Sequence, residues 1–398
     1  MVKEYFVKCL FFIVSVSYAA LITQTSLFYI SHPIYLYQTD LMNLITGGMI
    51  IREGKAKDLY NNETQLYYQN KVTYPYEKHI LLPFRNIPIV GFLYIPFTYM
   101  SLKMATISIF VINLGILFFF HKLFISNVPG LSESKQLLLL TLSYWPSVAT
   151  LISGQIVGLI LIAFALIFLT LIKKKYLLTG IFTSLLFLRP QTILFLPMLL
   201  LMVRNRKKFL AGFILSGLII FMLNICISGA GVIFGFPKFV FSIENTFFNG
   251  RLSDVSSVYF TIKQLFPSVG SSGLLVINGL LYLFFLIIFF IKRKSLSLIA
   301  GYSASLLITL LFSIHILSHD LIILLIPIYL ILSKNTIKPK NFFQNKLVLL
   351  LFFTPFLYLV GVPTISTLLL LCVLFYFIFP DIYKNFLAVG LRAKKFLL

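Results

Sequence analysis

Long apolar runs, separated by short polar segments, follow one another along almost the whole chain. Each run holds about 20 residues, enough for a helix to cross a hydrocarbon core of roughly 30 Å. Together they predict an all-α, polytopic integral membrane protein of about 12 transmembrane helices, built as a single transmembrane domain over residues 1–398. The runs are 9–30, 104–120, 137–152, 156–172, 209–228, 273–291, 296–316, 321–332, 347–361 and 363–379, with a broken pair at 177–188 and 191–203.

Prolines interrupt this pattern at two places. Arg189-Pro190 separates the broken pair. Because proline donates no hydrogen bond within a helix, the pair is either two half-spans that meet at a break or one kinked hairpin. The apolar segment 83–102 contains 3 prolines. It either crosses the membrane or returns to the face from which it enters.

The basic residues decide between these two topologies. If 83–102 does not cross, about two-thirds of the 33 Lys and Arg residues lie on one side of the membrane, in clusters between the spans. The positive-inside rule makes that side cytoplasmic, whereas a crossing would abolish the bias. We therefore expect 83–102 to be an interfacial or re-entrant segment, both termini to be cytoplasmic, and 381–398 to form a cytoplasmic tail.

Composition agrees with a membrane protein. The chain has 59% hydrophobic and 11% charged residues, whereas soluble domains average about 25% charged. Its net charge of +22 resides in the clusters between spans, so it indicates topology and no nucleic-acid partner. The 3 cysteines lie within apolar runs without metal-ligand spacing.

This topology places two long loops, 31–103 and 230–272, on the outer face. Long loops on a rigid scaffold are where binding and catalytic residues concentrate. The first outer loop is expected to contain interfacial helices. Leu41, Leu44 and Met49 recur there at helical spacing, which is typical of a helix lying in the membrane plane.

Asp40 stands at the beginning of this first outer loop. An ionised Asp costs roughly 2.5–3.5 kcal/mol at the bilayer centre, so its position marks the water edge of the first span. There it is either a general base, which a carboxylate at neutral pH can be, or part of an ordinary helix start. In the second case Thr39 or Asp40 caps the helix that follows.

Two further polar positions reach the outer face. Arg189 stands apart from the basic clusters, and its planar fork suits phosphate oxygens; the alternative is an arginine that snorkels to the membrane surface. Gln155, in the tripeptide SGQ, either holds a sugar hydroxyl or simply begins a helix.

The outer segment HILSHD contains His315, His319 and Asp320. Histidines four residues apart have a metal-ligand spacing on a helix, but no third helical ligand accompanies them. Alternatively, Ser318 caps the next helix and Asp320 complements its dipole. A third interpretation has His319 or Asp320 in contact with a sugar or a phosphate.

Taken in order, several short motifs resemble glycosyltransferase family 87, within the multi-spanning GT-C superfamily. They lie within roughly 38–330 and read TDLMN, REGKAKDLYN, PFRNIPIVGFLYIPFTYMSLKMA, SGQ, TGIFTSLLFLRPQ and HILSHDLIILLIP. The resemblance implies an inverting transfer of a sugar, most often mannose, from a polyprenyl phosphate to an acceptor hydroxyl. The acceptor would be linked to a glycan, a lipid or a protein, at the extracytoplasmic side of the plasma membrane.

By this resemblance Asp40 corresponds to the family's catalytic Asp and acts as general base. Arg189 is the candidate for binding the donor phosphate, and Gln155, His319 and Asp320 are candidates for contacting substrate. Some GT-C relatives carry paired acids, whereas Asp40 is single, so we expect no metal and no cofactor. The lipid-linked sugar is a co-substrate, and membrane lipids are the remaining partners.

Two other functions compete with this one. A transporter or lipid flippase usually places ionisable groups near the midplane and shows repeated halves; here the acids lie at span ends and no repeat is visible. A glycan polymerase or ligase with a lipid-diphosphate donor needs additional cations, which Lys238 and Arg251 of the second outer loop would supply.

Overall fold

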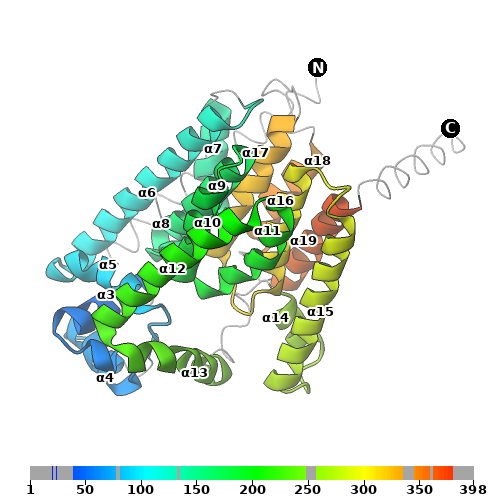
Figure 1. The fold of residues 1–398 in the computed structure, drawn as a ribbon. Coiled ribbons are helices and arrows are strands. Elements are labelled where there is room, and N and C mark those ends of the chain that lie inside the picture. The colour runs from blue at the N-terminus through cyan, green and yellow to red at the C-terminus, as the bar shows by residue number, and fades with distance from the viewer. Residues whose placement is uncertain are drawn as a thin grey trace, which may run out of the picture. The chain divides into compact units, whose positions relative to one another are not determined.

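The computed structural model describes residues 39–77, 81–131, 135–247, 257–334, 345–358 and 362–379, together with Ala20 and Gln24. Every regular element within these ranges is a helix (Figure 1). The predicted all-α class is therefore confirmed for this part of the chain. The predicted span 9–30, except Ala20 and Gln24, and the predicted tail 381–398 lie outside the described residues.

The chain forms two compact units. The first comprises Met1–Pro190, Asn205–Leu252 and Ser318–Ile323. Its helices are α3 (Asp40–Arg52), η1 (Ala56–Asp58), α4 (Asn62–Thr73), α5 (Pro88–Tyr94), η2 (Ile95–Tyr99), α6 (Leu102–Asn127), α7 (Lys135–Ser143), α8 (Trp145–Ser153), α9 (Val157–Ile172), α10 (Tyr176–Ser184), η3 (Leu185–Leu188), α12 (Arg206–Ser228), α13 (Ala230–Phe247) and nearly all of η7 (Ser318–Leu324).

The second unit comprises Gln191–Arg204, Ser253–Leu317 and Leu324–Leu398. Its helices are η4 (Pro190–Leu194), α11 (Phe195–Met202), α14 (Val258–Leu265), α15 (Ser271–Lys292), α16 (Leu298–Phe312), α17 (Leu325–Lys334), α18 (Lys346–Phe353), η9 (Thr354–Tyr358) and α19 (Pro363–Ile378).

Three of the described helices, α6, α12 and α15, are long and apolar enough to cross a membrane. The pair α7 and α8, bent by 56°, adds a fourth candidate if it is counted as one span. These helices support a membrane protein, but the expected count of about twelve crossings is not confirmed. The run 137–152, which looks continuous in sequence, is divided in the structure, with Pro146 in the first turn of α8. The predicted break at Arg189-Pro190 lies between η3 and η4.

The segment 83–102 starts without regular structure and then forms α5 and η2. Both helices together are shorter than a span. The position of this segment at the membrane surface stays a prediction.

Helix α3 is an internal helix. All residues from Leu41 to Ile50 are buried, so the apolar positions predicted to lie on the membrane pack within the protein instead. Glycines allow this close packing against α5 and the segment that precedes it. A Cβ on Gly48 would lie 3.1 Å from the carbonyl carbon of Tyr94, and one on Gly47 would lie 2.6 Å from the ring of Phe84.

Two buried glutamines of α4 hold the extended segment that precedes α5. Gln65 accepts a hydrogen bond from the Phe84 N–H at 2.8 Å, and Gln69 accepts one from the Leu82 N–H at 3.1 Å. Gln69 also donates to the Leu82 carbonyl at 2.5 Å. These amides satisfy backbone groups that a neighbouring strand would otherwise pair.

The far end of α3 is tied to α4 through Glu53. Lys71 donates to its carboxylate at 2.8 Å and the Tyr68 hydroxyl at 2.7 Å. These hydrogen bonds, that of Lys71 above all, lower the pKa of Glu53 to about 2. Asp40, the first residue of α3, stands at the opposite end of the helix from this ion pair.

Helices α10 and α12 run parallel and touch along their backbones. A Cβ on Gly180 would lie 2.0 Å from the Phe209 carbonyl oxygen, and one on Gly212 would lie 2.1 Å from that of Leu177. Further along α12, a Cβ on Gly217 would approach the ring of Phe187 in η3 at 3.3 Å. Small residues at such crossings let helices pack in an apolar environment.

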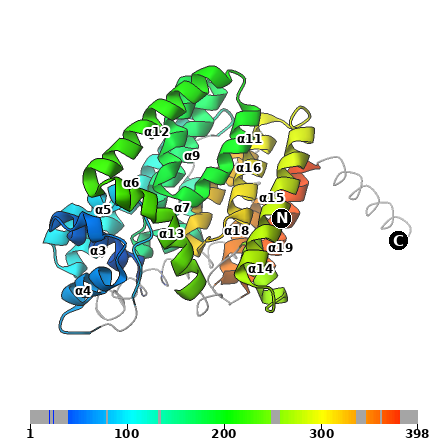
Figure 2. The same cartoon turned by 60° about the horizontal axis from the view of Figure 1, so that its bottom comes forward.

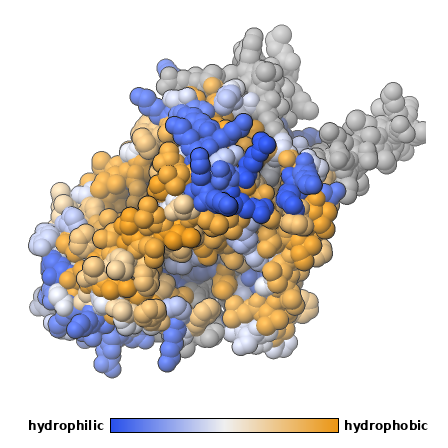
Figure 3. Space-filling model, in the orientation of Figure 1, coloured by the Kyte–Doolittle hydropathy of each residue, from blue (hydrophilic) through white to orange (hydrophobic). Residues whose placement is uncertain are grey.

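The basic clusters of the first unit gather at one end. Lys173 follows α9 and donates to the Asn127 side chain at the end of α6, at 2.6 Å. Lys175 directly precedes α10 and Arg206 begins α12, so the parallel course of these two helices places their cations at this end too. Figure 3 shows hydrophilic surface near the start of α12 and apolar surface along that helix. Helices α10 and α12 both begin at this basic end, and both therefore end at the opposite side of the first unit.

We expect Gly180→Ala to lower the thermal stability of the purified protein, because the new methyl group would meet backbone atoms that cannot move independently. Overpacking of this kind costs roughly 1–3 kcal/mol. Gly115→Ala in α6 is the matched control, since nothing lies within 4 Å of its added Cβ. An equal melting temperature for Gly180→Ala and the control would contradict the packing of α10 on α12.

Candidate functional site

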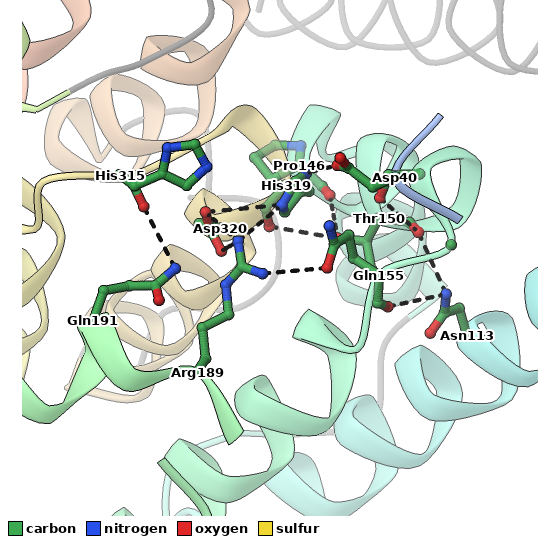
Figure 4. A network of polar contacts seen from close by, with 12 residues as sticks. Asp40, Asn113, Pro146, Thr150, Gln155, Arg189, Gln191, His315, His319 and Asp320 are labelled. Carbon is green, nitrogen blue, oxygen red and sulfur yellow. Dashed lines mark hydrogen bonds and ion pairs between the residues drawn. The ribbon is translucent and has the colours of Figure 1, made fainter. Parts of the chain in front are cut away.

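Four chain segments of the first unit end at one polar cluster. Gln155 follows α8, Arg189 follows η3, Asp40 begins α3, and His319 with Asp320 lies in the first turn of η7. Figure 4 shows these side chains directed toward one another. The structure thus brings together all five residues selected from the sequence.

Arg189 lies at the centre of this cluster. Its Nη2 lies 2.7 Å from Asp320 Oδ1 and donates to Oδ2 at 2.8 Å, and its Nη1 donates to Gln155 Oε1 at 3.2 Å. The Arg189 and Asp320 side chains are only 6% and 3% exposed. Burial of an isolated charge is very unfavourable, so the two groups require each other. Arg189 is therefore neither the isolated cation that its sequence position indicated nor a snorkelling arginine.

His319 connects Arg189 to Asp40. Arg189 Nη2 lies 3.1 Å from His319 Nε2. Because a guanidinium can only donate, Nε2 must accept, and the neutral ring carries its proton on Nδ1. Nδ1 lies 4.0 Å from Asp40 Oδ2. The imidazole N–H therefore faces the carboxylate, within a distance that a small movement would close.

Asp40 differs from the other charged groups of the cluster in its exposure. Its side chain is 26% exposed, whereas that of His319 is 4% exposed. The residue before it, Thr39, occupies the N-cap of α3 and makes no side-chain capping bond. Asp40 lies in the first turn, where the helix dipole favours a negative charge. It is thus not the N-cap, and it is the carboxylate of the cluster that an external molecule can reach.

Gln155 is positioned by the turn between α8 and α9. Gly154 has φ +69°, a left-handed conformation that favours glycine, and a Cβ there would lie 3.0 Å from the Leu41 Cβ of α3. The Tyr94 hydroxyl donates to the Gly154 carbonyl at 2.5 Å. Since α9 has Ile156 as its N-cap, Gln155 does not begin that helix, and its side chain serves Arg189 instead.

Side-chain hydroxyl groups of α8 and of its N-cap residue, Tyr144, hold the backbone of η7. The Thr150 hydroxyl donates to the His319 carbonyl at 3.5 Å, and Tyr144 donates to the Leu321 carbonyl at 3.3 Å. Asn113 of α6 in turn donates to the carbonyls of Thr150 and Gln155, at 3.3 and 3.4 Å. These side chains fix the backbone on which His319 and Gln155 stand.

His315 and His319 do not share a helix, because residues 313–317 are not helical, so the expected helical metal-ligand spacing does not apply. η7 begins at Ser318, which therefore lies inside the helix, whereas Asp320 lies in its first turn, as expected for a carboxylate that complements the helix dipole. His315 belongs to the second unit, where its carbonyl accepts from Gln191 at 3.5 Å. Within the described ranges, no group of three or more His, Cys, Asp or Glu side chains has metal-binding geometry.

Sequence reasoning missed two polar residues. Asn43 lies one turn after Asp40 on the same face of α3, and its buried Oδ1 has no hydrogen-bond partner. Asn113 orders the turn that carries Gln155. Both lie among apolar residues, where a polar side chain is costly and usually has a role. That is the signal that could have identified them.

Comparisons with known proteins give one family. The model described as glycosyltransferase family 87 matches residues 84–313, more than half of the 398 residues. The matched range contains Gln155 and Arg189, whereas Asp40, His319 and Asp320 lie outside it. No curated protein and no solved structure matches the chain.

We expect the pairing of Arg189 with Asp320 to dominate the stability of this cluster. Arg189→Met or Asp320→Leu alone would leave one buried charge uncompensated, which costs about 3–5 kcal/mol. The double variant removes both charges and should be more stable than either single variant. Thermal unfolding of the four proteins in the same detergent measures the coupling. Strictly additive losses would mean that the two side chains do not interact.

Proposed function

Because the chain belongs to glycosyltransferase family 87, we propose a specific reaction for this membrane glycosyltransferase. It transfers a sugar, with mannose as the first candidate, from a polyprenyl phosphate to an acceptor hydroxyl, with inversion. The reaction takes place at the extracytoplasmic side of the plasma membrane. The acceptor hydroxyl belongs to a glycan, a lipid or a protein.

The observation that carries this proposal is one accessible carboxylate, Asp40, facing a buried polar network centred on the Arg189 guanidinium. In the proposed reaction, Asp40 takes the proton from the acceptor hydroxyl while the oxygen of that hydroxyl attacks the anomeric carbon of the sugar. The bond between that carbon and the phosphate oxygen breaks on the opposite side, and its electron pair leaves with the polyprenyl phosphate. Each partner thus has one assigned group, a base for the acceptor and a cation for the leaving group.

Arg189 is the group proposed to bind the donor phosphate. Its guanidinium stays charged, and Gln155 and Asp320 hold it in one orientation. A preorganised donor of this kind stabilises charge that develops on the leaving oxygen. Asp320 already balances Arg189, so the donor phosphate would share the guanidinium with this carboxylate.

His319 is proposed to orient the base. With Nε2 held by Arg189, its Nδ1–H faces Asp40 and would direct the second carboxylate oxygen toward the acceptor. Asn43, one turn further along α3, is proposed to contact a substrate hydroxyl through its unpartnered amide oxygen. No metal ion and no cofactor has a step in this proposal.

The cation count favours a monophosphate donor over a diphosphate. Among the buried residues of the described ranges, Arg189 is the one Lys or Arg side chain. Lys238, considered above as an additional cation, is exposed on α13, and Arg251 lies outside the described residues. A donor with a second phosphate would add negative charge that the described part of the site does not balance.

Asp40→Asn tests the assignment of the base. Asn keeps the shape of Asp and is tolerated at helix starts, but it cannot take a proton. We expect sugar transfer by the purified variant to fall by about 10² to 10⁴ at unchanged melting temperature, the usual contribution of a general base.

Asp58→Asn is the matched control, because Asp58 is exposed in the first turn of η1 and does not belong to the cluster. It should transfer sugar at close to the wild-type rate. Turnover by Asp40→Asn equal to that of this control would remove Asp40 from the mechanism, whatever the donor is.

A further inference from the structure

Helix α13 has two apolar faces, and the described part of the chain covers one of them. On the covered face, the rings of Phe236 and Phe239 lie 5.2 and 4.9 Å from the ring of Tyr60. On the other face, Phe234 is 73% and Phe241 is 54% exposed. Lys238 is exposed between them, four residues after Phe234 and three before Phe241. This spacing places the three side chains in one stripe.

The exposed stripe continues the apolar surface of α12. That helix is a candidate span, and Leu218 and Met222 are 54% and 58% exposed on it. The Phe221 ring of α12 meets the Phe234 ring edge to face, with 6.3 Å between centroids. At Gly229, with φ +87°, the chain turns sharply, and α13 leaves the end of α12 in a new direction (Figures 1 and 2). The lipid-facing surface of the span thus extends onto α13.

The position of Lys238 determines how α13 can lie in a membrane. The helix has 18 residues, about 27 Å in length, and Lys238 is near its middle. If α13 crossed the membrane, the ammonium group would lie near the bilayer centre, at a cost of roughly 2.5–3.5 kcal/mol. If α13 lies in the interface, the same side chain extends to the lipid phosphates while the two rings enter the acyl chains.

We propose that Phe234, Lys238 and Phe241 form a lipid-binding surface. Through this surface, α13 lies on the membrane, within the headgroup layer. The two phenylalanines bind the upper part of the acyl chains, and Lys238 binds the lipid phosphate. The opposite face of α13 stacks on Tyr60, which donates to the Asn86 carbonyl at 2.9 Å. Membrane contact at α13 therefore supports the segment that leads into α5. In this arrangement Lys238 binds a membrane phospholipid, and it does not bind the phosphates of a diphosphate donor.

The test places a tryptophan on the stripe. The protein has 1 Trp, Trp145, so Phe234→Trp in a Trp145→Phe background gives a single emitter. If that background is unstable, the fluorescence of wild-type Trp145 is subtracted instead. The protein is studied in nanodiscs whose phospholipids carry bromine either near the head of the acyl chain or near its end, and iodide is the aqueous quencher.

We expect stronger quenching by bromine near the head of the chain than near its end, and little quenching by iodide. Leu218→Trp, in the middle of α12, is the reference for a deep position, and Glu63→Trp, exposed on α4, is the reference for water. Lys238→Glu should reduce the shallow quenching, and Lys238→Arg should retain it.

Three results would overturn the proposal. Quenching by iodide as strong as at Glu63→Trp means that the stripe faces water. A depth profile equal to that of Leu218→Trp means that α13 enters the membrane core. Protection from all quenchers means that protein covers the stripe. None of these results depends on sugar transfer.

Discussion

A buried guanidinium is the constraint on which the polar cluster depends. In a chain with 59% hydrophobic residues, Arg189 could not remain charged in the interior without a counter-charge and acceptors for its N–H groups. Asp320 supplies the charge, and Gln155 and His319 supply the acceptors. Three distant parts of the sequence therefore have to end at the same place. Once they do, the acceptor role of His319 Nε2 also fixes which ring nitrogen faces Asp40.

The helical scaffold makes this meeting possible by close packing at glycines. Gly180 and Gly212 let α10 and α12 touch, which directs η3 and Arg189 toward the cluster. Gly154 provides both a left-handed turn and room for Leu41, so that α3 and the turn before α9 are in direct contact. Asp40 is consequently placed by the packing of a buried helix. A loop at the membrane surface would not hold it as firmly.

Much of the cluster could be predicted from the sequence, because its residues are polar positions at the ends of apolar runs. Asp40, Gln155 and Arg189 each stand where a predicted span stops or breaks, and a consistent topology sends them to one face. The pairing of Arg189 with Asp320 could not be predicted, since it joins residues 131 apart. For the same reason the sequence presented Arg189 as an isolated cation.

The sequence could not predict whether lipid or protein covers a given apolar helix. The apolar positions of α3 have helical spacing, but spacing does not reveal whether lipid or protein covers the helix, and the structure shows protein. The sequence does not single out Gln65 and Gln69, because their partners are backbone groups that no sequence pattern marks. The number of spans was counted from apolar length, and the prolines and glycines that divide the runs make that count unreliable.

Sugar transfer by the purified protein in liposomes, from different labelled donors and with EDTA present, tests the central claim most directly. The account predicts that a polyprenyl-phosphate sugar supports transfer to an acceptor hydroxyl with inverted anomeric configuration, and that a nucleotide sugar does not. Transfer from the nucleotide sugar, exclusive use of a polyprenyl diphosphate, or retention of configuration would contradict it.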